Sequence, residues 1–296
     1  MPARILDGKL IAERLQAELA TGVRAARGHG HRAPGLAVLW VGDNPASELY
    51  VRNKDRAGRN VGIDTSLSRH LSGQVSQNEL LGIIDGLNAD ADVDGILVQL
   101  PLPAHLDSSI ILNRVDPDKD CDGLHPINLG RLVRGEPGLR SCTPAGVMVL
   151  LDEAGIDLTG KTAIVIGRST LVGKPVALML QEKNATVIMA HSKTEDLGAL
   201  TRIADVVVAA AGRPELVTGR MIKPGSAVID VGINRIIDYE GRQRTVGDVD
   251  FESVREVAGV LTPVPRGVGP MTVTMLLHNT VQSYRQRLGL KDFETW

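Results

Sequence analysis

The sequence predicts an α/β protein with two domains. Its 296 residues are too many for one small core, because a domain typically has about 150 residues. Hydrophobic residues make up 43% of the chain. Short apolar runs of strand length alternate with helix-like stretches in both halves, as in βαβ units with parallel sheets. The segment 116–142, rich in Pro, Gly and charge, lies between the halves and is interpreted as the crossing between domains.

Capping residues bound the predicted helices of the N-terminal half. Asn44 is expected to cap a helix that Pro45 opens and Gly62 ends. Ser76 and Glu79 have the spacing of a capping box at the start of a second helix. This half is predicted to contain a strand at 35–42, helices at 45–61 and 76–89, and a second strand at 94–100.

The C-terminal half shows the same alternation. A helix is expected with Thr143 as N-cap, Pro144 at its first position and Gly155 at its end. The predicted strands that follow are 161–167, 185–190, 205–212 and 226–232. Apolar residues after Pro270 recur at helical spacing, which predicts an amphipathic helix that packs back on a domain. They are Met275, Leu276, Val281, Tyr284 and Leu288.

Composition and charge exclude several classes of protein. The net charge of −2 gives no field that attracts nucleic acid or an anionic membrane, so neither is an expected partner. The N-terminus carries charges where a signal peptide needs an apolar core, and no apolar run reaches membrane-spanning length, which predicts a soluble, cytoplasmic protein. Cys121 and Cys142 form no C-x-x-C pair and are expected as reduced thiols. The histidines show no metal-ligand spacing, and a calcium loop starting at Asp90 would need glutamate where Pro101 stands, so no metal is predicted.

A glycine loop follows the first of these C-terminal strands. Strand, Gly167, turn and a helix from about Gly173 is the arrangement that points backbone N–H groups and a helix dipole at a phosphate. Ser169 replaces the second glycine of the dinucleotide fingerprint, and Pro175 after Lys174 removes the hydroxyl with which a triphosphate loop binds Mg²⁺. The context favours dinucleotide binding; the alternative is a doubly wound domain whose loop merely turns.

The residues after the next strand indicate which dinucleotide is bound. An acidic residue there would bind the ribose 2′-hydroxyl of NAD. This chain instead has His191, Ser192, Lys193 and Thr194. With Arg168 in the glycine loop, these donors and cations surround the place of a 2′-phosphate and favour NADP as the cofactor.

One lysine lies on the apolar face of the predicted helix 45–61. At about 100° per residue, one arc of this helix is shared by Ala46, Tyr50, Lys54, Ala57 and Val61. Lys54 is the only charged residue on this arc. Either its stem is buried while its amine reaches water, or burial disfavours the charge and leaves a neutral amine that accepts a proton. Tyr50, one turn earlier, would place an aromatic ring beside it.

Three other polar residues are candidates for a site. Gln99 ends a predicted strand at the sheet edge where open α/β proteins bind ligands, and its amide group either bonds the backbone or serves a ligand. Asp120 and Asp122 lie in a glycine-rich loop, where turn chemistry is the simpler interpretation.

Ten motifs, in order along nearly the whole chain, resemble those of the bifunctional methylenetetrahydrofolate dehydrogenase/methenyltetrahydrofolate cyclohydrolase family. They are ILDGK (5–9), SELYVRNKDRAGRNVGI (47–63), DGILVQLPLP (94–103), DPDKDCDGLHPINLG (116–130), CTPAGVMVLL (142–151), GRSTLVGKPVALML (167–180), HSKT (191–194), VIDVGIN (228–234), GDVDF (247–251) and PVPRGVGPMT (263–272).

The resemblance implies a fold and an activity. It implies two three-layer αβα domains with a cleft between them: a folate-binding catalytic domain, 1–142 with 272–296, and a Rossmann-type NADP domain, 143–271. The implied enzyme oxidises 5,10-methylenetetrahydrofolate with NADP⁺ and hydrolyses the methenyl product to 10-formyltetrahydrofolate. Tetrahydrofolate one-carbon derivatives are therefore the implied ligands, and a homodimer formed through the nucleotide domains is the implied assembly.

The resemblance also assigns roles to matching residues. Tyr50 stacks on the aminobenzoyl ring of the folate, and Lys54 handles protons around N10 and the attacking water. Gln99 hydrogen-bonds Lys54, and Asp122 accepts hydrogen bonds from the pterin. The further substrate-binding residues are Leu100, Pro101, Gly269 and Pro270. The cofactor-binding residues are Gly167, Arg168, Ser169, Ser192 and Ile233.

Two positions depart from the family pattern. Arg266 stands where the family commonly has glycine, and Cys121 where it commonly has valine. Arg266 either clashes with the backbone geometry of its loop or reaches an anion, such as the cofactor phosphate or the glutamate tail of the substrate. Two other functions fit the domain pattern: a different two-domain NADP dehydrogenase, such as one acting on a hydroxy acid, or a non-catalytic module that senses NADP.

Overall fold

The computed structural model describes residues 2–237 and 241–290, and the chain divides into two compact units. The three-stranded unit contains Glu13–Cys142 and Val273–Trp296, and the six-stranded unit contains Met1–Ala12 and Thr143–Thr272. Each unit has a parallel sheet with helices on both faces, which confirms the predicted α/β class with two αβα domains. Within the described ranges, no helix is long and apolar enough to cross a membrane.

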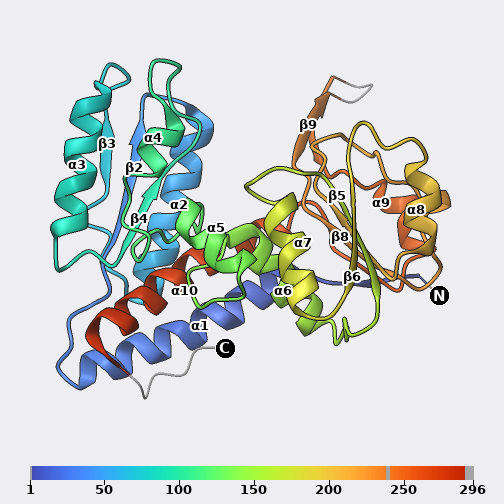
Figure 1. Ribbon diagram of the computed structural model, residues 1–296, viewed down its shortest axis with the longest axis horizontal. Coiled ribbons are helices and arrows are strands. Elements are labelled where there is room, and N and C mark those ends of the chain that lie inside the picture. Colours follow the sequence, from blue (N-terminus) through green and yellow to red (C-terminus); the bar gives the residue numbers. More distant parts are fainter. Residues whose placement is uncertain (1, 238–240, 291–296) are drawn as a thin grey trace. The chain divides into compact units, whose positions relative to one another are not determined.

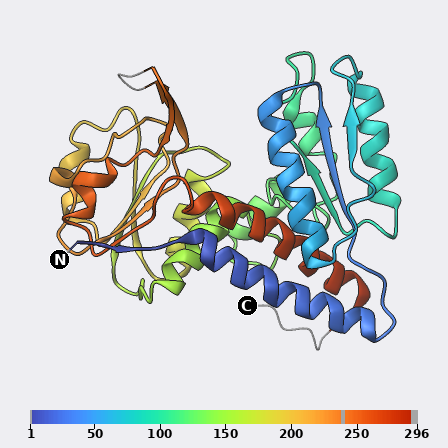
Figure 2. The ribbon, with the colours of Figure 1, turned by 180° about the vertical axis from the view of Figure 1, so that it is seen from behind.

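A parallel sheet of order β3-β2-β4 forms the centre of the three-stranded unit. Its strands are β2 (Leu36–Val41), β3 (Arg69–Leu71) and β4 (Gly95–Val98). Its helices include α2 (Pro45–Val61), α3 (Gln77–Ala89), α4 (Ser108–Leu112) and α5 (Pro126–Val133). Helices α2 and α3 lie on opposite sides of the strands (Figures 1 and 2). Side chains alternate along β2, so Leu39 and Val41 share one core with Leu80 and Ile84 of α3.

The larger sheet belongs to the six-stranded unit and has the order β1-β11-β8-β7-β5-β6, with every neighbouring pair parallel. Its strands are β1 (Arg4–Ile5), β5 (Thr162–Ile166), β6 (Thr186–Ala190), β7 (Val206–Ala209), β8 (Ala227–Asp230) and β11 (Val260–Leu261). An antiparallel pair is formed by β9 (Asn234–Ile237) and β10 (Gln243–Val246). The helices are α6 (Cys142–Glu153), α7 (Gly173–Glu182), α8 (Leu197–Ile203), the 3₁₀ helix η1 (Gly219–Met221) and α9 (Phe251–Arg255). Two long helices, α1 (Gly8–Gly28) and α10 (Val268–Leu288), contain residues of both units.

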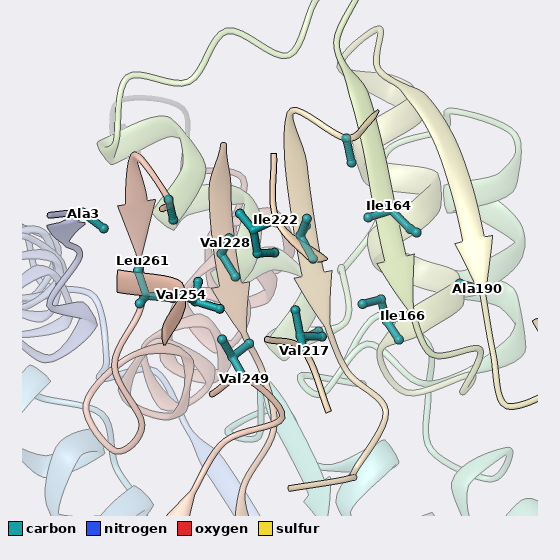
Figure 3. Close-up of a cluster of buried hydrophobic side chains, with 14 residues drawn as sticks. Ala3, Ile164, Ile166, Ala190, Val217, Ile222, Val228, Val249, Val254 and Leu261 are labelled. Atoms are coloured by element: carbon teal, nitrogen blue, oxygen red, sulfur yellow. The ribbon is translucent and has the colours of Figure 1, made fainter. Parts of the chain in front are cut away.

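Helices cover both faces of the six-stranded sheet. Helix α7 lies on one side of the strands, and α8 and α9 lie on the other (Figures 1 and 2). The core on the side of α8 and α9 is built from residues of the strands, of α9 and of the connecting segments, as Figure 3 shows for Ile164, Ile166, Val217, Val228, Val249, Val254 and Leu261. Because β5 lies between β6 and β7, the strand order reverses at β5. In open α/β sheets, ligands bind outside the carboxyl ends of the strands at such a reversal.

Local sequence signals correctly predict most element boundaries. The Asn44 side chain accepts a hydrogen bond from the Ser47 N–H (3.4 Å) at the start of α2, and Gly62 follows the helix with φ +94°. Ser76 and Glu79 form the expected capping box of α3. Each of the six predicted strands overlaps an observed one. The strands β1, β3, β9, β10 and β11 are outside the predictions, because they are short and their sequences lack a clear strand pattern.

Two predictions about segments were wrong. The segment 116–142 is not a crossing between domains: it lies wholly within the three-stranded unit and contains α5. The first twelve residues do not belong with 13–142, because β1 pairs with β11 and extends the larger sheet. The division of the chain therefore follows strand pairing rather than the order of the sequence.

Two predictions about single residues also need correction. Thr143 is not an N-cap, because α6 begins one residue earlier at Cys142; the Thr143 hydroxyl instead lies 3.0 Å from that of Thr272. Leu288 is 39% exposed at the end of α10, although the other four apolar residues predicted for this helix are buried.

Candidate active site and cofactor pocket

The glycine loop between β5 and α7 has a tight backbone that requires both of its glycines. Gly167 has φ +138°, and a Cβ there would collide with the carbonyl group of Ala210. A Cβ on Gly173 would collide with the carbonyl group of Gly167. The Ser169 hydroxyl accepts hydrogen bonds from the N–H groups of Val172 (3.1 Å) and Gly173 (3.3 Å). Ser169, where the common fingerprint has glycine, thus stabilises the turn that leads into α7.

A pocket of about 420 Å³, here called the glycine-loop pocket, opens at the carboxyl ends of β5, β6 and β7. The described residues that line it include no Asp or Glu, but they include three basic side chains, Arg168, His191 and Arg213. The other lining residues are Ile166, Gly167, Ser169, Ser192, Thr194, Leu197, Ala210, Ala211 and Leu216. The pocket therefore combines an apolar wall with donors and cations suited to an anionic ligand.

The turn after β6 contributes part of this pocket. The His191 N–H donates to the Thr194 hydroxyl (2.9 Å), and the Lys193 N–H donates to His191 Nδ1 (3.2 Å). These bonds hold Ser192 at the pocket wall. Lys193, which the sequence placed with the same donors, is exposed and does not line the pocket.

A second pocket of about 260 Å³, here called the Arg266 pocket, lies in the same unit. It brings together Ile233, predicted to contact the cofactor, with Gly269 and Pro270, predicted to contact the substrate. Arg266 also lines it, with a left-handed backbone (φ +86°) and an ion pair to Asp7. Arg266 therefore tolerates the backbone conformation that glycine would adopt freely, and its nearest described anion is a carboxylate of this chain.

Two of the candidate catalytic residues of the three-stranded unit, Lys54 and Gln99, meet at the carboxyl end of β4. Lys54 Nζ donates a hydrogen bond to Gln99 Oε1 (2.9 Å), and Gln99 Nε2 donates to the carbonyl oxygen of Leu100 (2.7 Å). The Leu100–Pro101 peptide bond is cis. Lys54 is half-buried, whereas Tyr50, one turn earlier on α2, is 46% exposed. A lysine amine is thus oriented by an amide group beside an accessible aromatic ring.

Asp122 differs from its neighbour Asp120. Burial raises the pKa of the Asp122 carboxyl, while the positive charge of Lys54 opposes the rise, so both groups belong to one electrostatic environment. The Asp120 carboxylate accepts hydrogen bonds from the His125 N–H (2.8 Å) and from Asn128 Nδ2 (3.0 Å). The turn interpretation therefore holds for Asp120, and Asp122 remains a candidate for ligand binding.

Both cysteines are free and buried. The Cys121 thiol donates to the carbonyl oxygen of Ile96 (3.2 Å), and the Cys142 thiol donates to that of Cys121 (3.1 Å). Burial raises both thiol pKa values well above their ordinary range. A buried cysteine behaves as a small hydrophobic residue, so Cys121 fills the place of the family's valine without adding a reactive thiol.

The pocket wall at Ala211 and Arg213 and the carboxylate that supports it were not predicted from the sequence. Asp248 accepts hydrogen bonds from the N–H groups of both residues. The local signal was the motif 247–251, in which a glycine precedes the carboxylate, but it did not show what that carboxylate contacts. Among the described residues, no three His, Cys, Asp or Glu side chains are grouped as a metal site.

The fold and the glycine-loop pocket define a two-domain α/β protein with a nucleotide-binding Rossmann-type sheet. Two family models match the chain. The catalytic domain of tetrahydrofolate dehydrogenase/cyclohydrolase matches residues 6–122, and the NAD(P)-binding domain of the same family matches residues 141–288. The chain therefore belongs to the tetrahydrofolate dehydrogenase/cyclohydrolase family.

Solved structures of similar proteins cover almost the whole chain. The bifunctional FolD methylenetetrahydrofolate dehydrogenase/cyclohydrolase from Campylobacter jejuni is 48% identical, with a TM-score of 0.92 over 96% of this chain and 99% of that one. FolD from Trypanosoma brucei, complexed with NADP cofactor and an inhibitor, is 40% identical, with a TM-score of 0.92 over 97% and 99%. The bifunctional enzyme from Thermoplasma acidophilum is 36% identical, with a TM-score of 0.89 over 97% and 100%.

Proposed function

We propose that this protein oxidises 5,10-methylenetetrahydrofolate with NADP⁺ and then hydrolyses the methenyl product to 10-formyltetrahydrofolate. The observation that carries the proposal is that one chain holds both a basic pocket behind the glycine loop and the hydrogen-bonded pair Lys54 and Gln99. The first suits an anionic dinucleotide and the second suits proton transfer. The trypanosomal relative, complexed with NADP, supports the choice of cofactor.

The glycine-loop pocket fits a dinucleotide phosphate. The two glycines allow the tight turn of the loop, because a Cβ on either would collide with a backbone carbonyl group, and the N-terminus of α7 favours negative charge. Arg168 and Ser192 are the groups that would hold a 2′-phosphate, with Gly167, Ser169 and Ile233 also contacting the cofactor. When bound, NADP⁺ supplies the hydride acceptor of the oxidation.

The three-stranded unit would bind the folate and move protons. Tyr50 would stack on the aminobenzoyl ring, because its ring is exposed one helical turn from Lys54. Asp122 would accept hydrogen bonds from the pterin N–H groups. Leu100 and Pro101 of this unit would also contact the substrate, and Gly269 and Pro270, which belong to the six-stranded unit, are proposed as further substrate contacts. On this basis, 13–142 with 273–296 is the folate-binding unit and 143–272 with 1–12 is the NADP-binding unit.

Hydrolysis needs a positioned water and a group that receives its proton. The methenyl carbon is electrophilic once the hydride has left, so a modest base suffices. In its uncharged form, Lys54 would take the proton from the attacking water at Nζ as the water oxygen bonds to this carbon, and the hydrogen bond to Gln99 Oε1 would keep that nitrogen in place. Breakage of the bond between this carbon and N5 would then give the 10-formyl product. The same amine thus serves the step that follows oxidation, without a second catalytic group.

A spectroscopic assay of the purified protein tests the proposal. With 5,10-methylenetetrahydrofolate and NADP⁺, NADPH absorbance is expected to rise, and the methenyl absorbance is expected to appear and then decay. Oxidation of a hydroxy acid without turnover of methenyltetrahydrofolate would instead support another two-domain dehydrogenase. NADPH binding without turnover of either folate would support a sensing module.

A homodimer is the assembly we propose. In the described part of the larger sheet, β6 is an edge strand, and its Met189 side chain is 40% exposed. An exposed edge with an apolar residue is suited to pairing with a second chain. Analytical ultracentrifugation should give the mass of two chains; a monomer at micromolar concentration would contradict this assembly.

A further inference from the structure

A buried carboxylate collects the backbone donors of the loop after β7. Asp248 is completely buried. Its Oδ2 accepts hydrogen bonds from the N–H groups of Ala211 (2.6 Å) and Gly212 (2.8 Å). Its Oδ1 accepts from the N–H of Arg213 (2.9 Å) and from Asn234 Nδ2 (2.8 Å). Three consecutive N–H groups therefore converge on one side chain, which fixes the path of this loop.

This loop is a wall of the glycine-loop pocket. Ala210, Ala211 and Arg213 all line the pocket. The carbonyl group of Ala210 is also the atom group that a Cβ on Gly167 would strike, so the loop and the glycine turn are in close contact. A shift of the loop would therefore change two walls of the pocket together.

A second buried carboxylate holds Asp248 itself. Asp230 Oδ1 accepts hydrogen bonds from the N–H groups of Asp248 (2.9 Å) and Gly232 (2.9 Å), and its Oδ2 accepts from that of Val249 (3.0 Å). Glycine is required on both sides: a Cβ on Gly232 would collide with the Asp248 carboxylate, and one on Gly247 would collide with that of Asp230. The two carboxylates are therefore closely packed and cannot shift independently.

We propose that Asp248 is a positioning residue for the dinucleotide, acting through the backbone of residues 211–213 rather than by touching the ligand. The proposal rests on the proposed function only in taking NADP as the ligand of the glycine-loop pocket. Four donors share the two oxygens of Asp248, two on each. The carboxylate is therefore needed as an acceptor at both oxygens.

The variant Asp248→Asn tests whether both oxygens are needed as acceptors, because asparagine has almost the same shape as aspartate. Its amide oxygen can serve one pair of donors, and its NH₂ group then faces the other pair and repels it. We expect the dissociation constant for NADPH, measured by fluorescence titration, to rise at least tenfold. The KM for NADP⁺ should rise in parallel, while kcat at saturating NADP⁺ changes less than threefold.

Asp250→Asn is the matched control. Asp250 lies two residues away and caps α9, where its carboxylate accepts hydrogen bonds from the N–H and hydroxyl of Ser253, outside both pockets. It should lower the melting temperature without changing NADPH affinity. Equal NADPH affinity in wild type and a folded Asp248→Asn would overturn the proposal, as would an equal loss of affinity in the control.

A milder variant decides the case if Asp248→Asn does not fold. Asn234→Ala removes one of the two donors to Oδ1 and leaves the carboxylate in place. It should raise the NADPH dissociation constant severalfold, and an unchanged value would overturn the proposal. Wild-type protein separates the two hypotheses: failure of wild type to bind NADPH refutes the cofactor itself, whereas normal binding by wild type and variants alike refutes only the role of Asp248.

Discussion

Lys54 and Gln99 are joined by a 2.9 Å hydrogen bond from the lysine Nζ to the amide Oε1, although they lie 45 residues apart on α2 and after β4. The other end of the Gln99 side chain is fixed as well, because its Nε2 donates to the backbone of Leu100. The amide group therefore has one orientation, with its oxygen toward the lysine. Such a fixed acceptor holds a flexible four-carbon side chain in one place, which a proton-transfer group requires.

Replacing this lysine should separate the two activities. Lys54→Met keeps an unbranched side chain of nearly the same length but cannot accept a proton, so cyclohydrolase turnover should fall about 10²-fold or more. NADPH affinity should be unchanged, because the glycine-loop pocket is built from other residues. Decay of methenyl absorbance measures the first quantity and fluorescence titration the second. Arg56→Met, an exposed change on the same helix, is the control and should retain hydrolysis. Unchanged hydrolysis by Lys54→Met would remove this residue from the mechanism.

The protein should be more stable with glycine at position 266 than with alanine. The φ of Arg266, +86°, is strained for any residue with a Cβ, at about 1 kcal/mol or more, and its ion pair with Asp7 involves a half-exposed guanidinium that contributes at most about 1 kcal/mol. Arg266→Ala loses the ion pair and keeps the strain, whereas Arg266→Gly loses both. The free energy of unfolding of the glycine variant should therefore exceed that of the alanine variant by roughly 1 kcal/mol. Chemical denaturation measures the difference, and an alanine variant that equals or exceeds the glycine variant contradicts the strain.

Unaltered Michaelis constants for NADP⁺ and folate in Arg266→Gly would further show that this arginine binds neither ligand. Its position on the wall of the Arg266 pocket makes that measurement informative. A rise in only one constant would identify which ligand it contacts.

Local chemistry explains what the sequence predicted well. The ends of α2 and α3 follow from Asn44, Gly62 and the Ser76 capping box, because caps satisfy backbone groups within a few residues. The glycine loop could be predicted equally well, because its strand, turn and helix are consecutive in the sequence. Arg168 and Ser192 could therefore be assigned to one pocket before its shape was known.

Long-range pairing explains what the sequence did not predict. β1 is two residues long and is a strand only because it pairs with β11, some 250 residues later in the chain. Thr143 has the residue type of an N-cap, but it lies inside α6 and its hydroxyl meets Thr272. Asp248 reaches the pocket only through N–H groups more than thirty residues earlier. No local pattern encodes such partners.

The buried Asp230 should make stability fall as pH rises through the weakly acidic range. Burial raises its pKa to about 7 in the folded protein, against an ordinary value of 3.8. Below about pH 4 both states are protonated, and between about 4 and 7 the folded state keeps a proton that the unfolded chain has released. Its contribution to the free energy of unfolding therefore falls by up to about 1.4 kcal/mol per pH unit and levels off above about 7.

Comparison with Asp230→Asn isolates this proton, because asparagine does not titrate. The stability of wild type minus that of the variant should fall between about pH 4 and 7 and stay flat above. Denaturant unfolding at a series of pH values gives both curves. Parallel curves would mean that the three N–H donors to this carboxylate outweigh its burial.

Arg168 should decide between NADP and NAD. It lines the glycine-loop pocket, and a guanidinium bond to a 2′-phosphate is worth about 1.5–3 kcal/mol. Arg168→Ala should therefore lower kcat/KM for NADP⁺ roughly tenfold to a hundredfold while leaving that for NAD⁺ nearly unchanged. Lys193→Ala is the matched control, since this cation follows Ser192 in sequence but does not line the pocket; it should leave the ratio of the two cofactors as it is. Equal losses with NADP⁺ and NAD⁺ in Arg168→Ala would show that the arginine contacts a part common to both cofactors, and a larger loss in Lys193→Ala would place the phosphate on the outer side of the turn.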